Sequence, residues 1–344
     1  MKNERKLVLM ITPYFYPHSG GVEKHVLEIS KRLVEQGFYV EIITDHFQNS
    51  LVKNEELGGI KIFRFFYPKI KFIGLVVIWW QMIFRFLAQF AKADIIHVHD
   101  VMIWILPVRA LFPRKKIILT MHGWEGTLPI PKKNIFLKKI SAIFANKVVC
   151  VGEYIGKYYH LSCDKVIYGG VGGFFSDSLK QKQSSLAYLG RLETDTGLPT
   201  LLKAISKEHS LSTIFIGEGL LRSQCEAVGK VTGWLSDKKI ANLLAKTYWC
   251  VASGYLSALE ALASGCEVIV IADSQLKQDY WQLGELKNFL HIVKNLQEMK
   301  QVIKKIKTKK IKSKNTFQRI SNQFSWEKLT DQYLQIYFSS IDLN

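Results

Sequence analysis

The sequence lacks the short motifs that most often hold a metal ion or a dinucleotide. It has no Asp-x-Asp motif, no Cys-x-x-Cys pair and no cysteine–histidine cluster with the spacing of a metal site. The glycine pair that follows the first apolar run does not fit the G-x-G-x-x-G pattern of dinucleotide-binding proteins. We therefore expect no metal ion and no resident cofactor.

Cysteine is also scarce. There are five cysteines, an odd number, and several of them lie in apolar runs: Cys150, Cys163, Cys225, Cys250 and Cys266. We expect buried thiols in a reducing cytosol rather than a disulfide framework. The first apolar run is short, is interrupted by Pro13 and lacks an A-x-A cleavage site, so we interpret it as a strand rather than a signal peptide.

Acidic side chains are few. The 29 aspartates and glutamates are outnumbered by 47 lysines and arginines, which leaves a net charge of +18. This balance favours an anionic partner, such as a phosphate-bearing small molecule, an anionic lipid headgroup or a nucleic acid. Because no motif interleaves aromatic with basic residues, we do not expect a nucleic-acid partner.

Apolar runs of strand length alternate with helix-length segments along the 344 residues. Two such series predict an α/β protein with two doubly wound domains, each a parallel sheet covered by helices on both faces. We expect domains at 1–175 and 184–322, with the polar stretch 176–185 between them. Ligands should bind at the carboxyl ends of the strands, facing a cleft between the domains.

The segment 72–90, "FIGLVVIWWQMIFRFLAQF", is unusually apolar for a helix. Its polar residues Gln81, Arg85 and Gln89 recur every four positions and so share one narrow stripe. A membrane-spanning helix would be barely long enough and would interrupt the strands of one sheet. We expect a helix packed on the core with one face in the bilayer interface; a wholly buried helix or a partner interface is the alternative.

Two strand–turn–helix segments carry candidate anion sites. Gly20 and Gly21 open a helix, where free N–H groups and the helix dipole favour an anion; tight-turn glycines without a ligand are the alternative. Arg191 follows a strand in the second half and is placed to pair with a diphosphate. A surface ion pair with Glu193 is the other interpretation.

His122 follows the strand "KIILTM" and precedes a loop that begins with Gly123. A histidine at the carboxyl end of a strand is a candidate ligand-binding residue, although a structural hydrogen bond is the alternative. His97 and His99 alternate on "DIIHVHD", and we interpret both as structural.

The order of the motifs over nearly the whole chain resembles glycosyltransferase family 4, a family of retaining enzymes with the GT-B fold. The matching segments are "SGGVEKHVLEISKRLVEQGFYVEIIT" at 19–44, "DIIHVHD" at 94–100, "TMHGWEG" at 120–126, "LGRL" at 189–192, "IGEGLLR" at 216–222, "GWLSDKKIANLLAKT" at 233–247, "LEALASG" at 259–265 and "FSWEKLTDQYLQIY" at 324–337.

The resemblance implies a GT-B fold of two Rossmann-like domains facing a central cleft. The first domain, 1–175, would bind the acceptor, and the second, 184–322, would bind a nucleotide-sugar donor. The C-terminal helix within 325–344 would return to the N-terminal domain.

The resemblance also assigns catalytic and phosphate-binding roles. Gly20 and Gly21 match the turn that lets the backbone approach the donor diphosphate. Arg191 matches the arginine that neutralises the departing diphosphate, and His122 matches the histidine that contacts the donor sugar at the reacting centre.

The remaining donor contacts that it implies lie in the second domain. Glu260 matches the second glutamate of the family's Glu-x7-Glu motif, which binds the ribose hydroxyls. Gly217 lies in the matching glycine-containing loop. Leu256 and Ser257 lie at a helix start, where their N–H groups would meet phosphate.

The sequence departs from the family at two positions. Ala252 occupies the place of the first glutamate of Glu-x7-Glu, and Thr196 occupies the place of a lysine. Either the enzyme is an active divergent branch, in which the basic balance and a residue such as Lys24 supply the missing cation, or it is a degenerate binding subunit of a glycan-assembly complex. Retention of the glycine turn, His122, Arg191 and Glu260 favours the first interpretation.

We therefore expect a metal-independent retaining hexosyltransferase that uses a UDP- or GDP-linked sugar. The basic charge and the apolar segment 72–90 favour an acceptor at the cytoplasmic face of a membrane: a lipid-linked glycan, a glycolipid or a precursor of a cell-envelope polysaccharide. The protein would be cytoplasmic and peripheral on the anionic inner face of the membrane. A nucleotide-sugar epimerase with the same two-domain fold, which needs no acceptor, is a further alternative.

Overall fold

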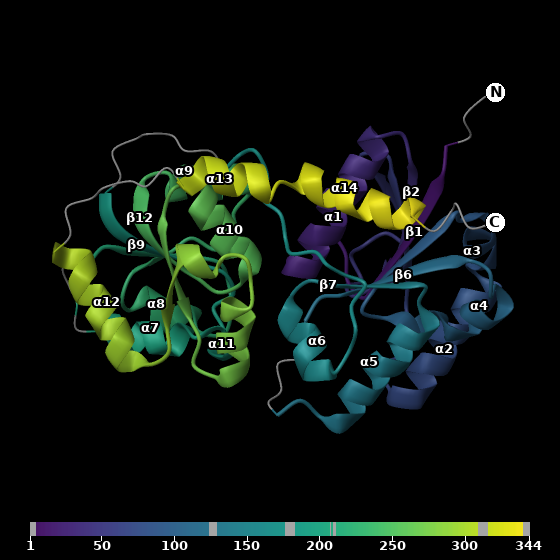
Figure 1. Ribbon diagram of the computed structural model, residues 1–344, viewed down its shortest axis with the longest axis horizontal. Helices are drawn as coiled ribbons and strands as arrows, with labels where there is room; N and C mark the ends of the chain where they lie inside the picture. Colours follow the sequence, from purple (N-terminus) through teal and green to yellow (C-terminus); the bar gives the residue numbers. More distant parts are fainter. Residues whose placement is uncertain are drawn as a thin grey trace. The chain divides into compact units, whose positions relative to one another are not determined.

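The computed structural model describes residues 5–123, 129–175, 183–206, 208, 211–308 and 316–339. The chain forms two compact units (Figure 1). Unit 1 comprises Met1–Ile167 and Leu329–Asn344, and unit 2 comprises Tyr168–Lys328. Most of the polar stretch expected between the domains, residues 176–182, lies outside the described residues.

Within the described ranges, unit 1 contains an eight-stranded sheet of order β3-β4-β2-β1-β5-β6-β7-β8. All neighbouring strands are parallel except β3 and β4, which form an antiparallel hairpin. The strands are β1 (Leu7–Thr12), β2 (Tyr39–Asp45), β3 (Asn54–Leu57), β4 (Ile60–Phe65), β5 (Ile95–His99), β6 (Lys116–Met121), β7 (Lys147–Cys150) and β8 (Lys165–Val166).

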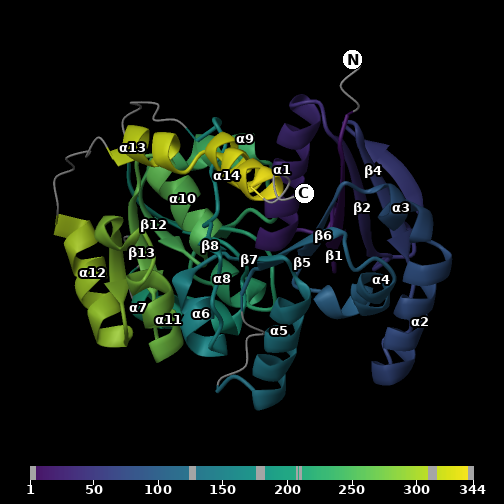
Figure 2. The same ribbon diagram turned by 45° about the vertical axis from the view of Figure 1, so that its right-hand side comes forward.

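Helices connect these strands, as parallel pairing requires. They are α1 (Gly21–Glu35), α2 (Lys71–Phe84), α3 (Leu87–Lys92), the 3-10 turn η1 (Met102–Ile105), α4 (Leu106–Leu111), α5 (Lys132–Phe144) and α6 (Glu153–Tyr159). Near the end of the chain comes α14 (Trp326–Phe338), whose residues from Leu329 on belong to unit 1 and lie against α1 (Figures 1 and 2). The predicted return of the last helix to the first domain is thus confirmed.

Unit 2 is built on a wholly parallel sheet that, in the described part of the chain, has the order β11-β10-β9-β12-β13-β14. Its strands are β9 (Gln183–Leu189), β10 (Thr213–Ile216), β11 (Lys230–Val231), β12 (Thr247–Ala252), β13 (Glu267–Ile271) and β14 (Leu290–Val293). The connecting helices are η2 (Thr194–Thr196), α7 (Leu198–Ile205), α8 (Arg222–Glu226), α9 (Asp237–Leu244), α10 (Tyr255–Ala263), α11 (Gln275–Gln282), η3 (Lys287–Phe289), α12 (Leu296–Thr308) and α13 (Thr316–Gln323).

The predicted α/β class is confirmed, but the single helix expected over 72–90 is wrong. Helix α2 ends at Phe84, and α3 begins only at Leu87. Between them Phe86 turns into the core, where its ring packs against Phe63 and Phe65. A straight helix would hold this large apolar side chain at a fixed angle, so burying it ends the helix.

The expectation of thiols alone is also wrong. Cys150, the last residue of β7, forms a disulfide with Cys163, which precedes β8, across a Cα–Cα distance of 6.0 Å. Strand β7 and the segment that enters β8 are brought together by sheet pairing, which sequence spacing does not show. The other three cysteines are buried free thiols, as expected.

Candidate active site

His122 leaves the sheet of unit 1 at the carboxyl end of β6. Strand β6 is buried between β5 and β7, so its last residues are fixed and the chain can turn only beyond Met121. The His122 backbone N–H donates to Asp100 Oδ1 (3.1 Å), and the imidazole Nε2 lies 2.9 Å from His99 Nδ1. Both the backbone and the ring of His122 are thus held from the neighbouring strand β5.

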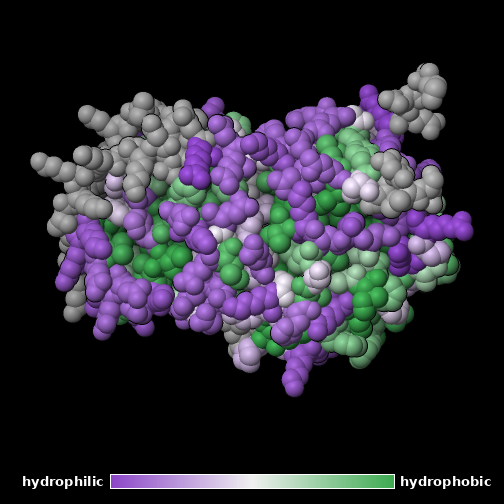
Figure 3. Space-filling view, in the orientation of Figure 1, coloured by the Kyte–Doolittle hydropathy of each residue, from purple (hydrophilic) through white to green (hydrophobic). Residues whose placement is uncertain are grey.

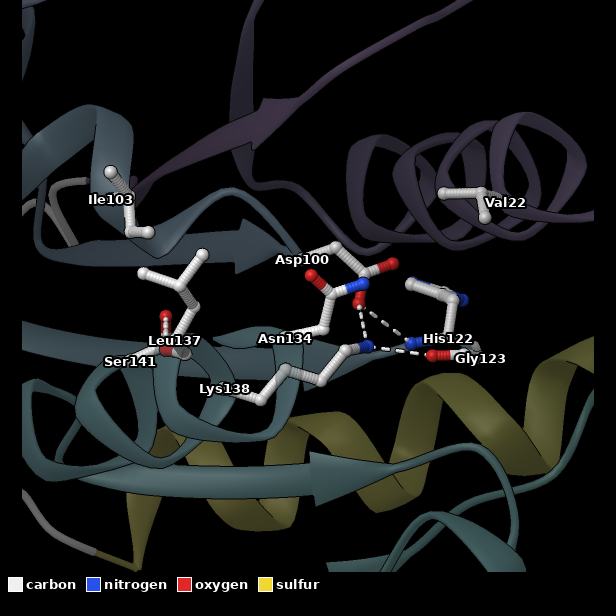
Figure 4. Close-up of a pocket in the computed structure, with 9 residues that line it drawn as sticks. All are labelled: Val22, Asp100, Ile103, His122, Gly123, Asn134, Leu137, Lys138 and Ser141. Carbon is white, nitrogen blue, oxygen red and sulfur yellow. Dashed lines mark hydrogen bonds and ion pairs between the residues drawn. The ribbon is translucent and has the colours of Figure 1, made fainter. Parts of the chain in front are cut away.

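A pocket of about 480 Å³ opens beside His122 (Figure 4). Its apolar walls are Val22 of α1, Ile103 of η1 and Leu137 of α5. The polar lining consists of Asp100, His122, Asn134, Lys138 and Ser141, and the backbone of Gly123 completes it. This mixture of one apolar side and several convergent polar groups is typical of a small-molecule binding site.

Asp100 is one of the few non-glycine residues of the described chain with a left-handed backbone, at φ 62°. For an aspartate this conformation costs on the order of 1 kcal/mol, and such strain gathers at functional sites. It turns the carboxylate, at the end of β5, towards the His122 backbone N–H and towards Lys138 Nζ, 3.4 Å from Oδ1.

Lys138 forms polar contacts with two loops on this side of the pocket. Its ammonium also donates to Gly123 O (2.6 Å) and lies 4.7 Å from the centre of the Tyr159 ring. One side chain of α5 therefore connects the loops that follow β5 and β6, as Figure 4 shows. Its main task is to position the groups around His122.

Beneath the pocket lies a buried hydrogen-bonded chain of histidines and tyrosines. His97 bonds to Tyr337 through Nδ1 (2.7 Å) and to Thr120 through Nε2 (2.8 Å). The Thr120 hydroxyl lies 3.2 Å from that of Tyr333, which lies 3.1 Å from His25 Nε2. The chain joins α1, β5, β6 and α14, so the C-terminal helix supports the floor of the site.

All four histidines of this region are neutral at pH 7. Burial lowers the pKa of His25 to about 4. Burial, followed by the neighbouring imidazoles, holds the pKa values of His97 and His99 well below the ordinary range. The same causes, with Lys138 added, lower the pKa of His122. Since none of them is charged, His122 acts as a neutral imidazole.

The glycine turn before α1 is arranged around a protein carboxylate. The Glu23 side chain folds back over the start of the helix and pairs with His18 Nδ1 (2.8 Å). A Cβ on Gly20 would lie 2.2 Å from Glu23 Oε2, so a larger residue there would displace this carboxylate. The contact of Gly20 and Gly21 with a diphosphate stays a prediction, because a carboxylate already lies at this helix start.

In unit 2 the sequence-predicted residues gather at one edge of the sheet. Strand β9 lies between β10 and β12, and the register pairs Leu189 with both Ile216 and Ala252. The residues that follow these strand ends therefore emerge side by side: Arg191 after β9, Gly217 after β10 and the start of α10 after β12. Gly217 has φ 147°, and a Cβ there would lie 1.9 Å from Gly190 O. The loop after β10 thus packs directly against the backbone of the loop after β9, which only a glycine at position 217 allows.

Arg191 is an exposed cation at this edge. It pairs with Asp195 across 2.8 Å rather than with Glu193, whose Oε1 instead accepts from the Leu220 N–H (3.1 Å). An exposed pair of this kind contributes less than about 1 kcal/mol, so the guanidinium can readily turn to a diphosphate.

Helix α10 opens with its own capping interactions. The Ser257 hydroxyl donates to Gly254 O (2.8 Å) and accepts from Gly254 N–H (3.0 Å), and the Tyr255 N–H donates to the Tyr280 hydroxyl (3.0 Å). The next two N–H groups, of Leu256 and Ser257, belong to the first turn and have no intrahelical acceptor. Glu260 follows in the next turn and is 5% exposed. Its contact with a ribose stays a prediction.

The two positions that differ from the family motifs, Ala252 and Thr196, both hold uncharged residues at this edge of the sheet. Ala252 is buried at the end of β12. The Thr196 hydroxyl donates to Glu193 O (2.7 Å) and lies 2.8 Å from the Tyr188 hydroxyl, which donates to Arg191 O (2.8 Å). Thr196 therefore stabilises the turn that carries Arg191, a structural task that a lysine could not perform in the same way.

Sequence reasoning missed Asp100 and Lys138 as site residues and gave His99 only a structural role. A signal for Asp100 existed, since a carboxylate directly after a buried strand lies at the ligand-binding edge of a parallel sheet. Nothing in the sequence marks Lys138, which is one lysine among several on α5. The motif residues that follow Gly123, up to Gly126, lie outside the described part of the chain. In that part no group of three or more His, Cys, Asp or Glu residues is arranged to hold a metal ion.

Part of the chain matches a known protein family. Residues 19–171 match the family described as Glycosyltransferase Family 4. A segment of 56 residues is 34% identical to one of the subunits of human phosphatidylinositol N-acetylglucosaminyltransferase, but it covers only 16% of this chain and 12% of that protein.

The fold is similar to that of solved GT-B glycosyltransferases. Sucrose-phosphate synthase from Thermosynechococcus elongatus superposes with a TM-score of 0.77 at 16% identity, over 97% of this chain and 99% of that one. An Anabaena protein, HepE, solved with UDP and glucose, gives 0.72 at 15% identity, again over 97% and 99%. The two parallel-dominated α/β sheets have the GT-B fold, and residues 19–171, within which most of unit 1 lies, match glycosyltransferase family 4.

Proposed function

We propose that the protein transfers a sugar from a UDP- or GDP-linked donor to an acceptor hydroxyl, with retention of the anomeric configuration. The observation that carries this proposal is the edge of the unit 2 sheet, where Arg191, the loop at Gly217 and the start of α10 emerge from adjacent strands. A cation and free helix N–H groups in one place suit a diphosphate. The Anabaena structure that holds UDP and glucose has a similar fold.

In the proposed reaction the bond between the sugar's anomeric carbon and the diphosphate breaks, and a bond to the acceptor oxygen forms on the same face. The departing diphosphate takes the acceptor's proton. Arg191 and the start of α10 stabilise the charge that develops on the diphosphate, and no metal ion is required for this step. Glu260 binds the ribose hydroxyls, and His122 donates a hydrogen bond to the sugar.

The acceptor is proposed to bind in the pocket of unit 1, with a lipid portion resting on α2 and α5. Helix α2 buries Ile78 and Met82 together with the polar Gln81, which donates to Phe66 O (2.7 Å). Its remaining apolar residues are exposed, among them Phe72, which is 84% exposed, and Trp80. Such an exposed apolar face on a water-facing helix is costly unless something covers it.

Helix α5 continues this apolar surface. Phe136 and Ile143 are exposed, and three exposed lysines accompany them without any acidic residue on the helix: Lys132, Lys133 and Lys139. Helices α2 and α5 both pack against η1 and extend towards the same end of unit 1 (Figure 2). Figure 3 shows a hydrophobic area over α2 and α4 in this part of the unit.

Helix α5 lines the pocket, and α2 packs against η1, which also contributes to it. Both helices suit an anionic bilayer, because apolar side chains would enter the interface and the lysines would meet the headgroups. Within the described ranges, no helix has the length and apolar character that a membrane crossing requires. A lipid acceptor also agrees with the name of the human relative, which refers to phosphatidylinositol.

Isothermal titration with UDP, GDP and their glucose, N-acetylglucosamine and mannose conjugates tests the donor site. We expect one nucleotide to bind, and Glu260→Ala to weaken it by roughly 10- to 100-fold, since hydrogen bonds to a charged group contribute about 1.5–3 kcal/mol. Glu226→Ala on the exposed side of α8 is the matched carboxylate control and should bind like the wild type.

Turnover separates the remaining alternatives. Transfer to a lipid acceptor supports the proposal. Donor binding without turnover would instead favour a non-catalytic binding role, for which the loss of the family's glutamate and lysine at Ala252 and Thr196 is the specific observation. Release of an isomerised sugar nucleotide would identify an epimerase. Absence of binding by every nucleotide would overturn the donor site.

A further inference from the structure

His122 is oriented by another imidazole. Its Nε2 lies 2.9 Å from His99 Nδ1, in a contact that is partly closed to solvent. Because both rings are neutral, one nitrogen of this pair carries the proton and donates, and the other accepts. The direction of this hydrogen bond determines which face of His122 can donate to a ligand.

The second nitrogen of His99 decides the direction. His99 Nε2 is buried and, within the part of the chain that the structure describes, has no hydrogen-bond partner. If His122 donated, His99 would carry its proton on Nε2, and that N–H would be buried without an acceptor. Buried N–H groups without an acceptor are rarer in proteins than buried acceptors without a donor. The favoured arrangement therefore has His99 Nδ1–H donating to His122 Nε2.

We infer that His99 is a positioning residue that fixes His122 as its Nδ1–H tautomer. In this state the Nε2 lone pair of His122 is occupied by His99, and Nδ1–H remains as the ring's only other hydrogen-bonding group. His122 then offers a hydrogen-bond donor to its ligand and has no nitrogen available as a general base. The ligand in this statement is the sugar, so that part of the inference rests on the proposed function.

The surroundings of the pair keep both rings in this state. His25 of α1 faces both of them, with ring centroids 5.0 Å from His122 and 6.2 Å from His99. His97 of β5 lies 4.2 Å from His99. Lys138 of α5 lies near His122, and Asp100 accepts from the His122 backbone N–H. Burial lowers the pKa of both imidazoles, and the Lys138 ammonium further opposes a second proton on His122.

A fixed donor suits a retaining transfer. The reaction moves one proton, from the acceptor to the departing diphosphate, and a base near the anomeric carbon would compete for it. A neutral donor can stabilise charge on a sugar oxygen without exchanging protons during the reaction. The rate should then show no imidazole titration near neutral pH.

Heteronuclear NMR of protein labelled on its histidine ring nitrogens reads the tautomer directly, because protonated and bare ring nitrogens have different chemical shifts. The His122 signals are assigned by their loss in His122→Gln. We expect the wild-type protein to show His122 protonated on Nδ1 and bare on Nε2. A wild-type His122 protonated on Nε2 would overturn the inference.

Two variants that are isosteric with each other test whether His99 sets this state. His99→Asn places an amide near the position of Nδ1, whose N–H can donate as His99 does, and should allow the Nδ1–H tautomer of His122. His99→Asp places an acceptor there and should move the proton of His122 to Nε2. Because a buried carboxylate can prevent folding, His99→Leu is a second test variant. Leucine offers no hydrogen bond, so His122 should no longer favour the Nδ1–H tautomer. Retention of that tautomer in the leucine variant would also overturn the inference.

The same His99 variants test whether the tautomer of His122 affects the rate of sugar transfer. We expect kcat in the transfer assay to fall by about 100-fold in His99→Asp, the cost of losing one hydrogen-bond donor to the reacting centre, and His99→Asn to recover most of it. Equal kcat in the aspartate and asparagine variants would show that the tautomer has no role in transfer. The NMR experiment needs no substrate, so failure of every donor to bind would count against the proposed function alone.

Discussion

At the scale of single residues, Thr196 gives a direct test of why this chain departs from its family. Its hydroxyl connects Glu193 O with the Tyr188 hydroxyl beneath the Arg191 turn. Thr196→Val keeps the shape and removes the hydroxyl, so we expect the free energy of unfolding to fall by about 1–2 kcal/mol.

Denaturant unfolding measures this loss, and Thr194→Val is the control. Thr194 lies on the same turn but is exposed, so its substitution should leave stability unchanged. If both valine variants were as stable as the wild type, the hydroxyl of Thr196 would have no structural task, and its presence in place of a lysine would need another explanation.

Individual site residues differ in how far the sequence could predict them. His122 and Arg191 follow buried strands, and strand ends are recognisable from apolar patterning. The partners that hold them are not recognisable in this way: Lys138 lies on another helix, and His99 contacts His122 only because β5 and β6 pair in register, His99 with Thr120. Contacts of this kind depend on pairing between distant segments, which one sequence does not reveal.

At the scale of elements, α2 makes the membrane proposal testable. We expect the wild-type protein to float with vesicles that contain phosphatidylglycerol and to stay in solution with phosphatidylcholine alone, because the lysines near α2 and α5 need anionic headgroups. Replacing both Phe72 and Trp80 by glutamate should abolish flotation, since each removes an exposed aromatic side chain and adds a repelled charge.

The matched control is Leu220→Glu in unit 2. Leu220 is 88% exposed, so the substitution makes the same chemical change on a surface away from α2, and flotation should persist. Flotation of the Phe72/Trp80 double variant at the wild-type level would rule out α2 as the contact. Absence of flotation by the wild type in both lipids would remove the membrane from the proposal.

The sequence predicted that α2 is a helix, but not how it lies. Its narrow polar stripe normally marks the solvent side of a helix. Here Gln81 instead donates to Phe66 O, in the segment after β4, and Arg85 donates to Arg64 O, within β4. These contacts keep the polar groups on the protein side, and Phe72 and Trp80 remain exposed.

At the scale of the whole molecule, the two parallel sheets were predictable because long Val/Ile/Leu runs alternate with helices. The strands that escaped prediction are short edge strands, such as the two-residue β8 and β11, and the hairpin strand β3. Strands of this length carry too little apolar pattern to stand out, and they form only because a longer neighbour offers free backbone groups.

The buried histidines make the stability of unit 1 depend on pH. Burial lowers the pKa of His25 to about 4, from an ordinary 6.5, and holds those of His97 and His99 well below that value. The unfolded chain therefore binds more protons than the folded one below about pH 6.5, so stability is complete above that pH and falls as the pH decreases.

Between about pH 6.5 and about pH 5.5, each such histidine lowers the free energy of unfolding by about 1 kcal/mol, or about 4 kcal/mol when His122, whose pKa is lowered in the same way, is included. Denaturant unfolding at about pH 6.5 and about pH 5.5 measures the loss, and His25→Gln, which removes one titrating group, should reduce it by about a quarter. His291→Gln is the control, because His291 is paired with Glu267 near the surface of unit 2 and should leave the pH dependence of unit 1 unchanged. An equal free energy of unfolding at both pH values would mean that these imidazoles accept protons without destabilising unit 1. The hydrogen-bonded chain His25–Tyr333–Thr120–His97 would then not be needed to hold the C-terminal helix in place.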